Sequence, residues 1–184
     1  MDEVVDLQNK YHISSISDDD KSNGFVTTQF TRIQLNDLIN CEAGLCVARK
    51  NNKLVGYVMS ASWSYWAQWP IFVKMASELQ DIKFNGLKLN RNITYQYGPV
   101  CIDKLERGSG VLEALFEYSR IKMSPKFQIL ITFINKTNSR SFIAHTKNLG
   151  LKVVHEFEYN NNQYYELAYD ASCPLLSKRL PELK

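Results

Sequence analysis

The residues Tyr97-Gly-Pro-Val-Cys-Ile-Asp103 run into Lys104-Leu-Glu-Arg107-Gly-Ser-Gly110 and then into Val111-Leu-Glu-Ala-Leu-Phe116. In an extended segment, Val100 and Ile102 share one face and Cys101 lies on the other. From Val111 onward, apolar residues return every three or four positions, which is typical of a helix. The sequence therefore predicts a strand, a glycine-containing turn and a helix that begins at the turn.

The start of such a helix suits a phosphate or pyrophosphate group. Its first backbone N–H groups have no partner inside the helix, and the helix dipole places positive charge there. Gly108 and Gly110 let the backbone approach a ligand, and Arg107 adds a fixed charge. A plain βα turn without a ligand has the same residues, so both interpretations stay open. The turn is not a Walker A loop, and Glu113 stands where a dinucleotide fingerprint needs glycine.

Composition indicates an ordinary globular chain. Its 184 residues, 45% of them apolar and 22% charged, predict one domain with its own core. A net charge of +3 without a Lys/Arg run argues against nucleic acid as a partner. No apolar stretch has the length of a membrane span, and the acidic start Met1-Asp-Glu-Val-Val-Asp6 is not typical of a signal peptide. We therefore expect a cytoplasmic protein with neither nucleic-acid nor membrane partners.

The cysteines predict free thiols in a reducing compartment. They form no CxxC pair and have no histidine at zinc spacing, so we expect no metal site. They are Cys41, Cys46, Cys101 and Cys173.

Outward from the central stretch, two hairpins and one buried strand are expected. Residues 45–50 and 53–59 flank Asn51-Asn52, and asparagine tolerates the positive φ of a tight turn. Residues 127–134 form a continuous apolar run typical of a buried strand. The second hairpin spans residues 151–159 and 163–169. Helices are expected over residues 4–11, 31–40, 70–79, 111–123 and 139–148, with loops over 14–23 and 85–92. This order predicts an α/β or α+β domain with a mixed sheet.

The segment Trp63-Ser-Tyr-Trp66-Ala-Gln-Trp69 places all three tryptophans of the chain within seven positions. Such a cluster is typical of core packing. It would also serve as the apolar wall of a substrate pocket, and the sequence leaves both roles open.

In the order of its elements and motifs, the chain resembles the GNAT superfamily of acyl-CoA N-acyltransferases over roughly residues 24–170. The family motif Arg/Gln-x-x-Gly-x-Gly/Ala is matched from Arg107 to Val111, with Leu112 in the sixth position. The resemblance implies a mixed, mostly antiparallel central sheet flanked by helices. The family begins with a strand before its first helix, whereas this chain starts almost at the helix. The first edge strand is therefore expected to be absent from the single domain over residues 1–184.

A later family pattern, Asn-x-x-Ala/Ser-x-x-x-Tyr, is similar to Asn138, Ser141 and His145, with histidine in the tyrosine position. The resemblance implies acetyl-CoA as the acyl-donor substrate. The backbone of the strand would pair with the pantetheine arm, the turn would hold the pyrophosphate, and Asn138 and Ser141 would contact the donor from the next helix. The implied binding residues are Val100, Cys101, Ile102, Arg107, Gly108, Ser109, Gly110, Val111, Leu112, Asn138 and Ser141.

The chemistry that the resemblance implies is direct attack of an amine on the thioester, without a covalent enzyme intermediate. His145, in the tyrosine position, is the candidate that protonates the leaving thiolate; a buried helix histidine with a backbone partner is the alternative. Asp103 and Tyr97 are the candidate bases. Asp103 has the alternative role of a turn or capping residue.

The expected function is an N-acetyltransferase that acts on an amine of a small molecule or a peptide. A module of the same fold that binds CoA or acyl-CoA without turnover is the alternative. The sequence leaves open the acceptor, the acid and base, an acyl group longer than acetyl, and the oligomeric state. A homodimer that covers the exposed sheet edge is one option.

Overall fold

The computed structural model describes residues 1–176, except for the side chains of Asp19, Asp20 and Ser22. Residues 177–184 of the predicted domain lie outside the described residues. The helices are α1 (Asp2–Lys10), α2 (Arg32–Asp37), α3 (Trp63–Trp66), α4 (Pro70–Glu78), α5 (Val111–Met123) and α6 (Ser139–Ile143). Short 3₁₀ helices span Asp18–Asn23, Leu79–Asp81 and Lys104–Glu106, and π-helical turns extend α2 over Leu38–Glu42 and α6 over Ala144–Asn148.

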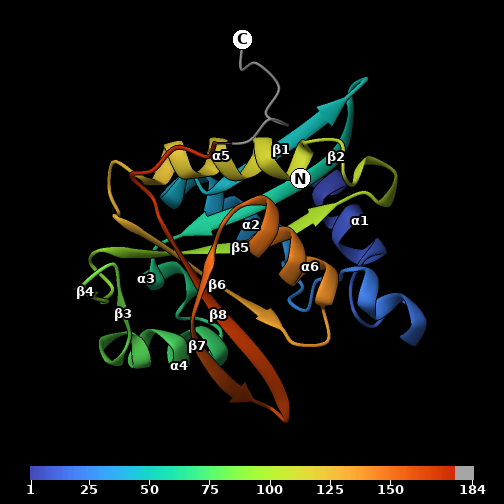
Figure 1. Ribbon diagram of the computed structural model, residues 1–184. Coiled ribbons are helices and arrows are strands. Elements are labelled where there is room, and N and C mark those ends of the chain that lie inside the picture. The colour runs from blue at the N-terminus through green and yellow to red at the C-terminus, as the bar shows by residue number, and fades with distance from the viewer. Residues whose placement is uncertain (177–184) are drawn as a thin grey trace.

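A six-stranded sheet forms the centre of the molecule (Figure 1). Its order is β1-β2-β5-β6-β8-β7, and every neighbouring pair is antiparallel except β5 and β6. The predicted mixed, mostly antiparallel sheet is therefore confirmed. Within residues 1–176 no strand pairs with the outer edge of β1, as expected for a missing first strand. The strands are β1 (Leu45–Lys50), β2 (Lys53–Ala61), β5 (Thr94–Ile102), β6 (Ile129–Asn135), β7 (Lys152–Tyr159) and β8 (Asn162–Asp170).

Asparagine turns close both predicted hairpins. Asn51 and Asn52 have φ of 50° and 62° between β1 and β2, and Asn160 and Asn161 have φ of 47° and 58° between β7 and β8. These left-handed values match the twist of a two-residue hairpin turn, and asparagine adopts them more readily than most residues. The segment expected as a turn-rich connection also holds a small hairpin, β3 (Lys83–Phe84) with β4 (Leu87–Lys88).

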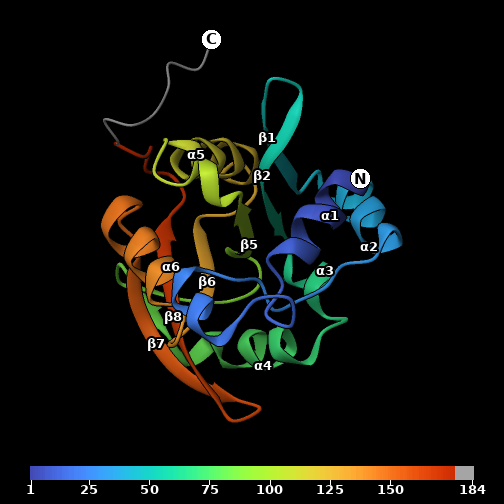
Figure 2. The ribbon, with the colours of Figure 1, turned by 90° about the vertical axis from the view of Figure 1, so that its right-hand side faces the viewer.

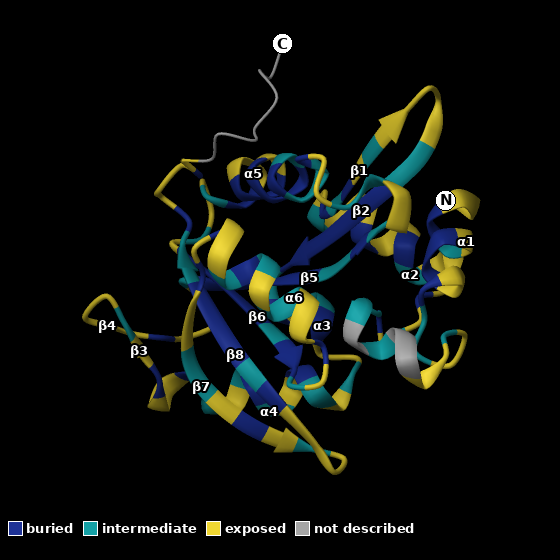
Figure 3. Cartoon of the chain, turned by 45° about the vertical axis from the view of Figure 1, so that its right-hand side comes forward, coloured by how far each residue is buried: buried dark blue, intermediate teal, exposed yellow. Residues whose placement is uncertain are grey.

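Helices cover both faces of the sheet. One core packs α5 and the α6 region against one face, with Phe116 and Leu130 among its buried residues. The other core packs α1 to α4 against the opposite face, with Trp66 and Ile131 among its members. Leu130 and Ile131 fall in different cores because successive side chains of β6 point to opposite faces. Figure 3 shows the buried residues following the central strands, with exposed positions on outer helix faces and hairpin tips.

The tryptophan cluster belongs to the second core. Trp63 donates from Nε1 to Thr94 Oγ1 over 2.8 Å, and Trp66 donates to the Ala61 carbonyl over 3.2 Å. The Trp66 ring lies 4.7 Å from the ring of Phe72 and 6.0 Å from that of Phe30. Of the two roles left open by the sequence, the structure supports core packing. In the described part of the chain, no helix combines the length and apolar character needed to cross a membrane.

We predict that Trp66→Ala lowers the free energy of unfolding by about 3–5 kcal/mol, because the ring is fully buried and leaves a cavity. Denaturant unfolding measures the change. Val73→Ala on α4 is the control, since that side chain is 45% exposed. Equal losses in the two variants would contradict the assigned core role.

Glu166 on β8 is a buried carboxyl beneath α4. Its side chain is fully buried, and neither oxygen has a hydrogen-bond partner, although His155 Nδ1 lies 3.4 Å from one of them. Burial, and next the charge of Glu78, raise the pKa of Glu166 to about 8, while Lys74 opposes this rise. Glu166 is therefore protonated in the folded protein at neutral pH.

We predict that Glu166 makes a contribution to stability that is lost as the pH rises from about 5 to about 8. An unfolded glutamate releases its proton near a pKa of about 4.3, and Glu166 holds its proton up to about 8 in the fold. Between these values the folded state binds more protons, so the free energy of unfolding falls with rising pH. Urea unfolding across this range should show a weaker decline in Glu166→Gln. The exposed Glu158→Gln is the control, and equal declines in all three proteins would contradict the prediction.

Candidate functional site

The sheet opens between its two parallel strands. β5 and β6 pair only through Thr94–Gln96 and Ile129–Ile131. Beyond Gln96, β5 continues to Ile102 beside β2, whereas β6 continues to Asn135 beside β8. The two strands therefore diverge and leave a V-shaped gap (Figure 1).

The backbone of β5 faces this gap at alternate residues. Asp103 N–H donates to the Val55 carbonyl over 2.8 Å, and the same register pairs Cys101 with Tyr57. In an antiparallel ladder, hydrogen-bonded and non-hydrogen-bonded pairs alternate. The N–H and C=O groups of Val100 and Ile102 consequently point away from β2 and into the gap. The family resemblance implies a ligand-facing backbone over residues 100–102, and the register gives this orientation to Val100 and Ile102.

Cys101 lies between them with a different orientation. Its backbone belongs to the pair with Tyr57, and its thiol donates to the Leu7 carbonyl over 3.8 Å in the core on the other face. Burial raises the pKa of Cys101 to about 12, so it remains a thiol. Although Cys101 borders the gap, this geometry gives it no group for a ligand there.

The turn before α5 has the conformation that its glycines suggest. Gly108 and Gly110 have φ of 81° and 91°, a left-handed region that favours glycine. Gly110 is the N-cap of the 13-residue α5, and no side chain caps the helix. The first-turn amides of Val111 and Leu112 are thus left for a ligand. The Ser109 hydroxyl donates to the Glu106 carbonyl, so this side chain is already hydrogen-bonded within the turn.

An outer cleft of about 570 Å³ lies along the gap on the side of this turn. Two arginines, Arg107 and Arg140, line it, and one acidic residue, the buried Glu113, lines it as well. The side chains of this outer cleft therefore carry a net positive charge. The sequence analysis missed Arg140, whose signal was a basic residue two positions after Asn138. The other lining residues used below are Val100, Ile102, Gly108, Leu112, Ser141 and His145.

Arg107 also fastens the N-terminal segment. Its Nε donates to the Ile102 carbonyl over 3.1 Å, and Nη1 donates to the carbonyl of Asn23. The guanidinium lies 4.9 Å from the Tyr11 ring centre. Burial, and less strongly the nearby Arg140, lower its pKa, but a guanidinium stays charged at neutral pH. Its predicted contribution of charge to a phosphate stays a prediction.

Asn138 ties residues 23–28 across the gap. Its Nδ2 donates to the Phe25 carbonyl over 3.3 Å, while its Oδ1 accepts from Ser141 N–H over 3.2 Å and caps α6. Figure 2 shows the blue segment after α1 beside α6. The crossing segment separates the outer cleft from a smaller inner pocket.

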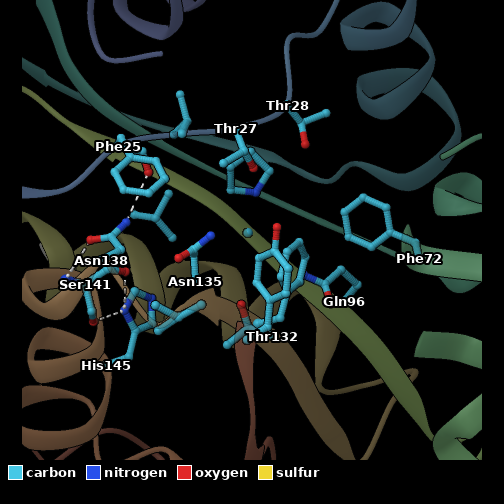
Figure 4. A pocket seen from close by; sticks show the side chains of 17 residues that line it. Phe25, Thr27, Thr28, Phe72, Gln96, Thr132, Asn135, Asn138, Ser141 and His145 are labelled. Carbon is cyan, nitrogen blue, oxygen red and sulfur yellow. Dashed lines mark hydrogen bonds between the residues drawn. The ribbon is translucent and has the colours of Figure 1, made fainter. Parts of the chain in front are cut away.

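The inner pocket has a volume of about 80 Å³. It shares Phe25, Val26, Val100, Asn138, Ser141 and His145 with the outer cleft. In Figure 4, His145, Ser141 and Asn138 lie at one end of it, and Gln96 and Phe72 lie at the other. The two cavities thus adjoin each other, and His145 belongs to the wall that they share.

His145 is the predicted catalytic residue that the fold places at this junction. It is 6% exposed, and Nδ1 lies 2.8 Å from the Ser141 carbonyl. Because a carbonyl only accepts, Nδ1 carries the proton. Burial lowers the pKa of His145, so the ring is neutral and Nε2 holds a lone pair. It has the backbone partner expected of a structural histidine, and it also borders both cavities.

The other two candidates border neither cavity. Asp103 accepts from Leu105 N–H over 3.1 Å and from Lys10 Nζ over 2.7 Å, which is the capping role considered as its alternative. Tyr97 is fully buried in the core, with its ring 5.4 Å from that of Phe116 and 6.0 Å from that of His145. The geometry therefore gives neither residue access to a reacting group.

Comparison of the sequence with known families and with curated proteins finds no match. Comparison of the fold does find similar structures. An N-acetyltransferase from Staphylococcus aureus Mu50 has a TM-score of 0.57 at 15% identity, with 92% of each chain covered. A GNAT-family acetyltransferase from Streptococcus pneumoniae has a TM-score of 0.58 at 16% identity, with 91% of each chain covered. A putative acetyltransferase, yncA, from Salmonella typhimurium, solved with its cofactor acetyl-CoA, has a TM-score of 0.52 at 14% identity, covering 78% of this chain and 75% of that one.

The chain therefore has the fold of the GNAT acetyltransferases, as its motifs predicted. At these identities the likeness establishes the fold alone, and the activity has to be argued from the cleft and the pocket.

We predict that Arg107→Met lowers the free energy of unfolding by about 1–3 kcal/mol, because the carbonyls of Ile102 and Asn23 lose a partly buried donor. Arg140→Met should change it by less than about 0.5 kcal/mol, since Arg140 is exposed. Urea unfolding of the matched pair measures both. Equal effects would show that Arg107 does not brace the N-terminal segment.

Proposed function

We propose that the protein is an N-acetyltransferase that transfers an acetyl group from acetyl-CoA to an amine. The observation that carries this proposal is the divergence of β5 from β6, with the Val100 and Ile102 backbone directed into the gap. The gap ends at an uncapped, glycine-led helix start and reaches the buried His145 on its other side.

The residues of the outer cleft fit the acyl donor. A pantetheine arm is an extended chain with amide groups, which the outward-facing N–H and C=O groups of β5 suit as a strand would. The turn amides from Gly108 to Leu112 suit a pyrophosphate, with Arg107 and Arg140 adding charge. Leu112, the departure from the family motif, still supplies its backbone N–H. Glu113 lines the same outer cleft and weakens its attraction for anions.

His145 would handle the proton of the reaction. The thioester of acetyl-CoA supplies the activated acetyl group. As the amine nitrogen forms its bond to the acetyl carbon, the bond from carbon to sulfur breaks, and the sulfur leaves with the electron pair. The neutral imidazole first accepts the amine proton at Nε2, and the imidazolium then returns a proton to the thiolate side. In this order His145 acts first as a base, because its tautomer leaves Nε2 unprotonated, and then as the acid toward the thiolate that the sequence analysis expected.

Acetyl-CoA should raise the melting temperature. At roughly a hundred times its dissociation constant it adds about 2.7 kcal/mol, a rise of roughly 5–11 °C for a chain of this size. Desulfo-CoA should act similarly, whereas ATP and NAD serve as controls. Arg140→Met should reduce the rise without changing the melting temperature of the free protein. No rise with any CoA compound at saturation would refute the proposed donor site.

Replacing His145 by alanine should separate catalysis from binding alone. We expect kcat to fall by a factor of about 10²–10⁴, the usual contribution of a general acid–base residue. The thermal shift with acetyl-CoA should persist. In the wild-type enzyme, kcat at saturating amine should decline only below the ordinary histidine pKa of about 6.5, because burial lowers the pKa of His145. An unchanged kcat would exclude His145 from the mechanism, and a protein that binds CoA without turnover would favour the binding-module alternative.

A further inference from the structure

The inner pocket is lined by uncharged groups. Seventeen residues line it, and Asp, Glu, Lys and Arg are not among them. Its one histidine is neutral, since burial lowers the pKa of His145. Aromatic walls come from Phe25, Phe72, Phe133 and Tyr164. A positively charged ligand would therefore enter without a carboxylate to balance it, which is unfavourable at a desolvated site.

Gln96 directs an unsatisfied acceptor to this pocket. Its side chain is 1% exposed, and Nε2 donates to the Tyr97 carbonyl over 2.8 Å. That bond fixes the amide orientation, because a carbonyl only accepts. The remaining atom, Oε1, is buried and has no hydrogen-bond partner. A buried acceptor of this kind calls for a donor, and the pocket that Gln96 lines is where one can come from.

Asn135 lies between Gln96 and His145 in Figure 4, but its amide is already used. Its Nδ2 donates to Asn162 Oδ1, and its Oδ1 accepts from the backbone and hydroxyl of Thr137. Two uncharged acceptors therefore stand out in the pocket, Gln96 Oε1 and His145 Nε2. An acceptor that satisfies both carries its amine at His145 and a second N–H donor, such as a peptide N–H, at Gln96.

The basicity of the acceptor decides how readily it enters in neutral form. A peptide α-amine has a pKa of about 7.7–8.0, against about 10.4 for a lysine side chain. Near pH 7.5 roughly a quarter to two-fifths of the α-amine is neutral, compared with about 0.1% of the alkyl amine. A pocket without carboxylates therefore favours the α-amine by roughly 200-fold.

We propose that the acceptor is the α-amine of a peptide whose first side chain is small and uncharged. This inference rests on the proposed acetyl transfer. His145 Nε2 takes the proton that the amine nitrogen loses, and Gln96 Oε1, at the other end of the pocket, receives a backbone N–H of the peptide. A volume of about 80 Å³ admits the amine and a short side chain. The exposed Thr27 forms part of the rim, where the rest of the peptide leaves the pocket.

The transfer is balanced without an oxidant or a further reactant. The neutral amine forms an N–C bond to the acetyl carbon, and the C–S bond breaks with its electron pair going to sulfur. The nitrogen gives up one proton and the thiolate takes up one proton. The products are an N-acetyl peptide and a free thiol.

The first experiment compares acceptors of different basicity at about pH 7.5. Trialanine amide, Nα-acetyl-lysine amide and spermidine are each offered with acetyl-CoA, and thiol release is followed. We expect kcat/KM for trialanine amide to exceed the other two by about 100-fold or more. Preference for spermidine or for the lysine side chain would overturn the inference.

Gln96 variants test the recognition itself. Gln96→Leu should lower kcat/KM for trialanine amide by about tenfold or more. Gln96→Glu adds a carboxylate and should shift the ratio between spermidine and the peptide by at least about tenfold toward spermidine. The exposed Gln128→Leu is the control for the same substitution, with no change expected. The melting transition of each Gln96 variant shows whether it is folded. If both variants are folded and the ratio of kcat/KM between trialanine amide and spermidine is unaltered in both, the role of Gln96 is overturned.

Calorimetric binding of trialanine amide to the protein saturated with CoA supplies a readout without turnover. We expect binding that Gln96→Leu weakens about tenfold. A thermal shift with acetyl-CoA but no peptide binding would overturn the acceptor inference and leave the proposed donor site standing. No thermal shift with any CoA compound would instead refute the donor site, and the acceptor inference with it.

Discussion

The short pairing between β5 and β6 is the constraint on which the site depends. These parallel strands share only Thr94–Gln96 and Ile129–Ile131 before each follows a different partner. Because Cys101 is committed to Tyr57, the backbone groups of Val100 and Ile102 must face the gap. A sheet that stayed closed here would satisfy those groups with β6 and leave no cavity. The open gap thus leaves the backbone of Val100 and Ile102 without a strand partner on that side, and the Ile102 carbonyl accepts from Arg107 instead.

The N-terminal segment turns one gap into two cavities of different character. Arg107 holds it through the Asn23 carbonyl, and Asn138 holds it through the Phe25 carbonyl. The outer cleft receives the helix start and the arginines, so its potential favours anions. The inner pocket receives only uncharged groups. This contrast would keep the proposed anionic donor and the proposed weakly basic acceptor in separate cavities, with His145 in the wall that the cavities share.

Buried uncharged acceptors are the basis of the selectivity that we propose for the inner pocket. Gln96 Oε1 has no partner inside the fold, which is unfavourable for the free protein and becomes useful when an N–H donor arrives. Glu166 behaves differently, although it is also buried without a hydrogen-bond partner. Because the pKa of Glu166 is raised, its carboxyl stays protonated and uncharged at neutral pH. It therefore lowers stability only as the pH rises, and it requires no ligand.

Much of the fold followed from local patterns in the sequence. The predicted bounds of α5 match the structure, and Asn51-Asn52 marked the first hairpin, because periodicity and turn chemistry act between close neighbours. The gap, the helix start and His145 were also indicated by motif. Only the tertiary structure decided which predicted residues border a cavity. Asp103 forms an ion pair with Lys10, which is 93 positions away in the chain, and the Cys101 thiol points into the core. Gln96 and Arg140 line the cavities, although the sequence did not indicate them as site residues. Those outcomes depend on partners far apart in the chain, which packing brings together and local pattern does not encode.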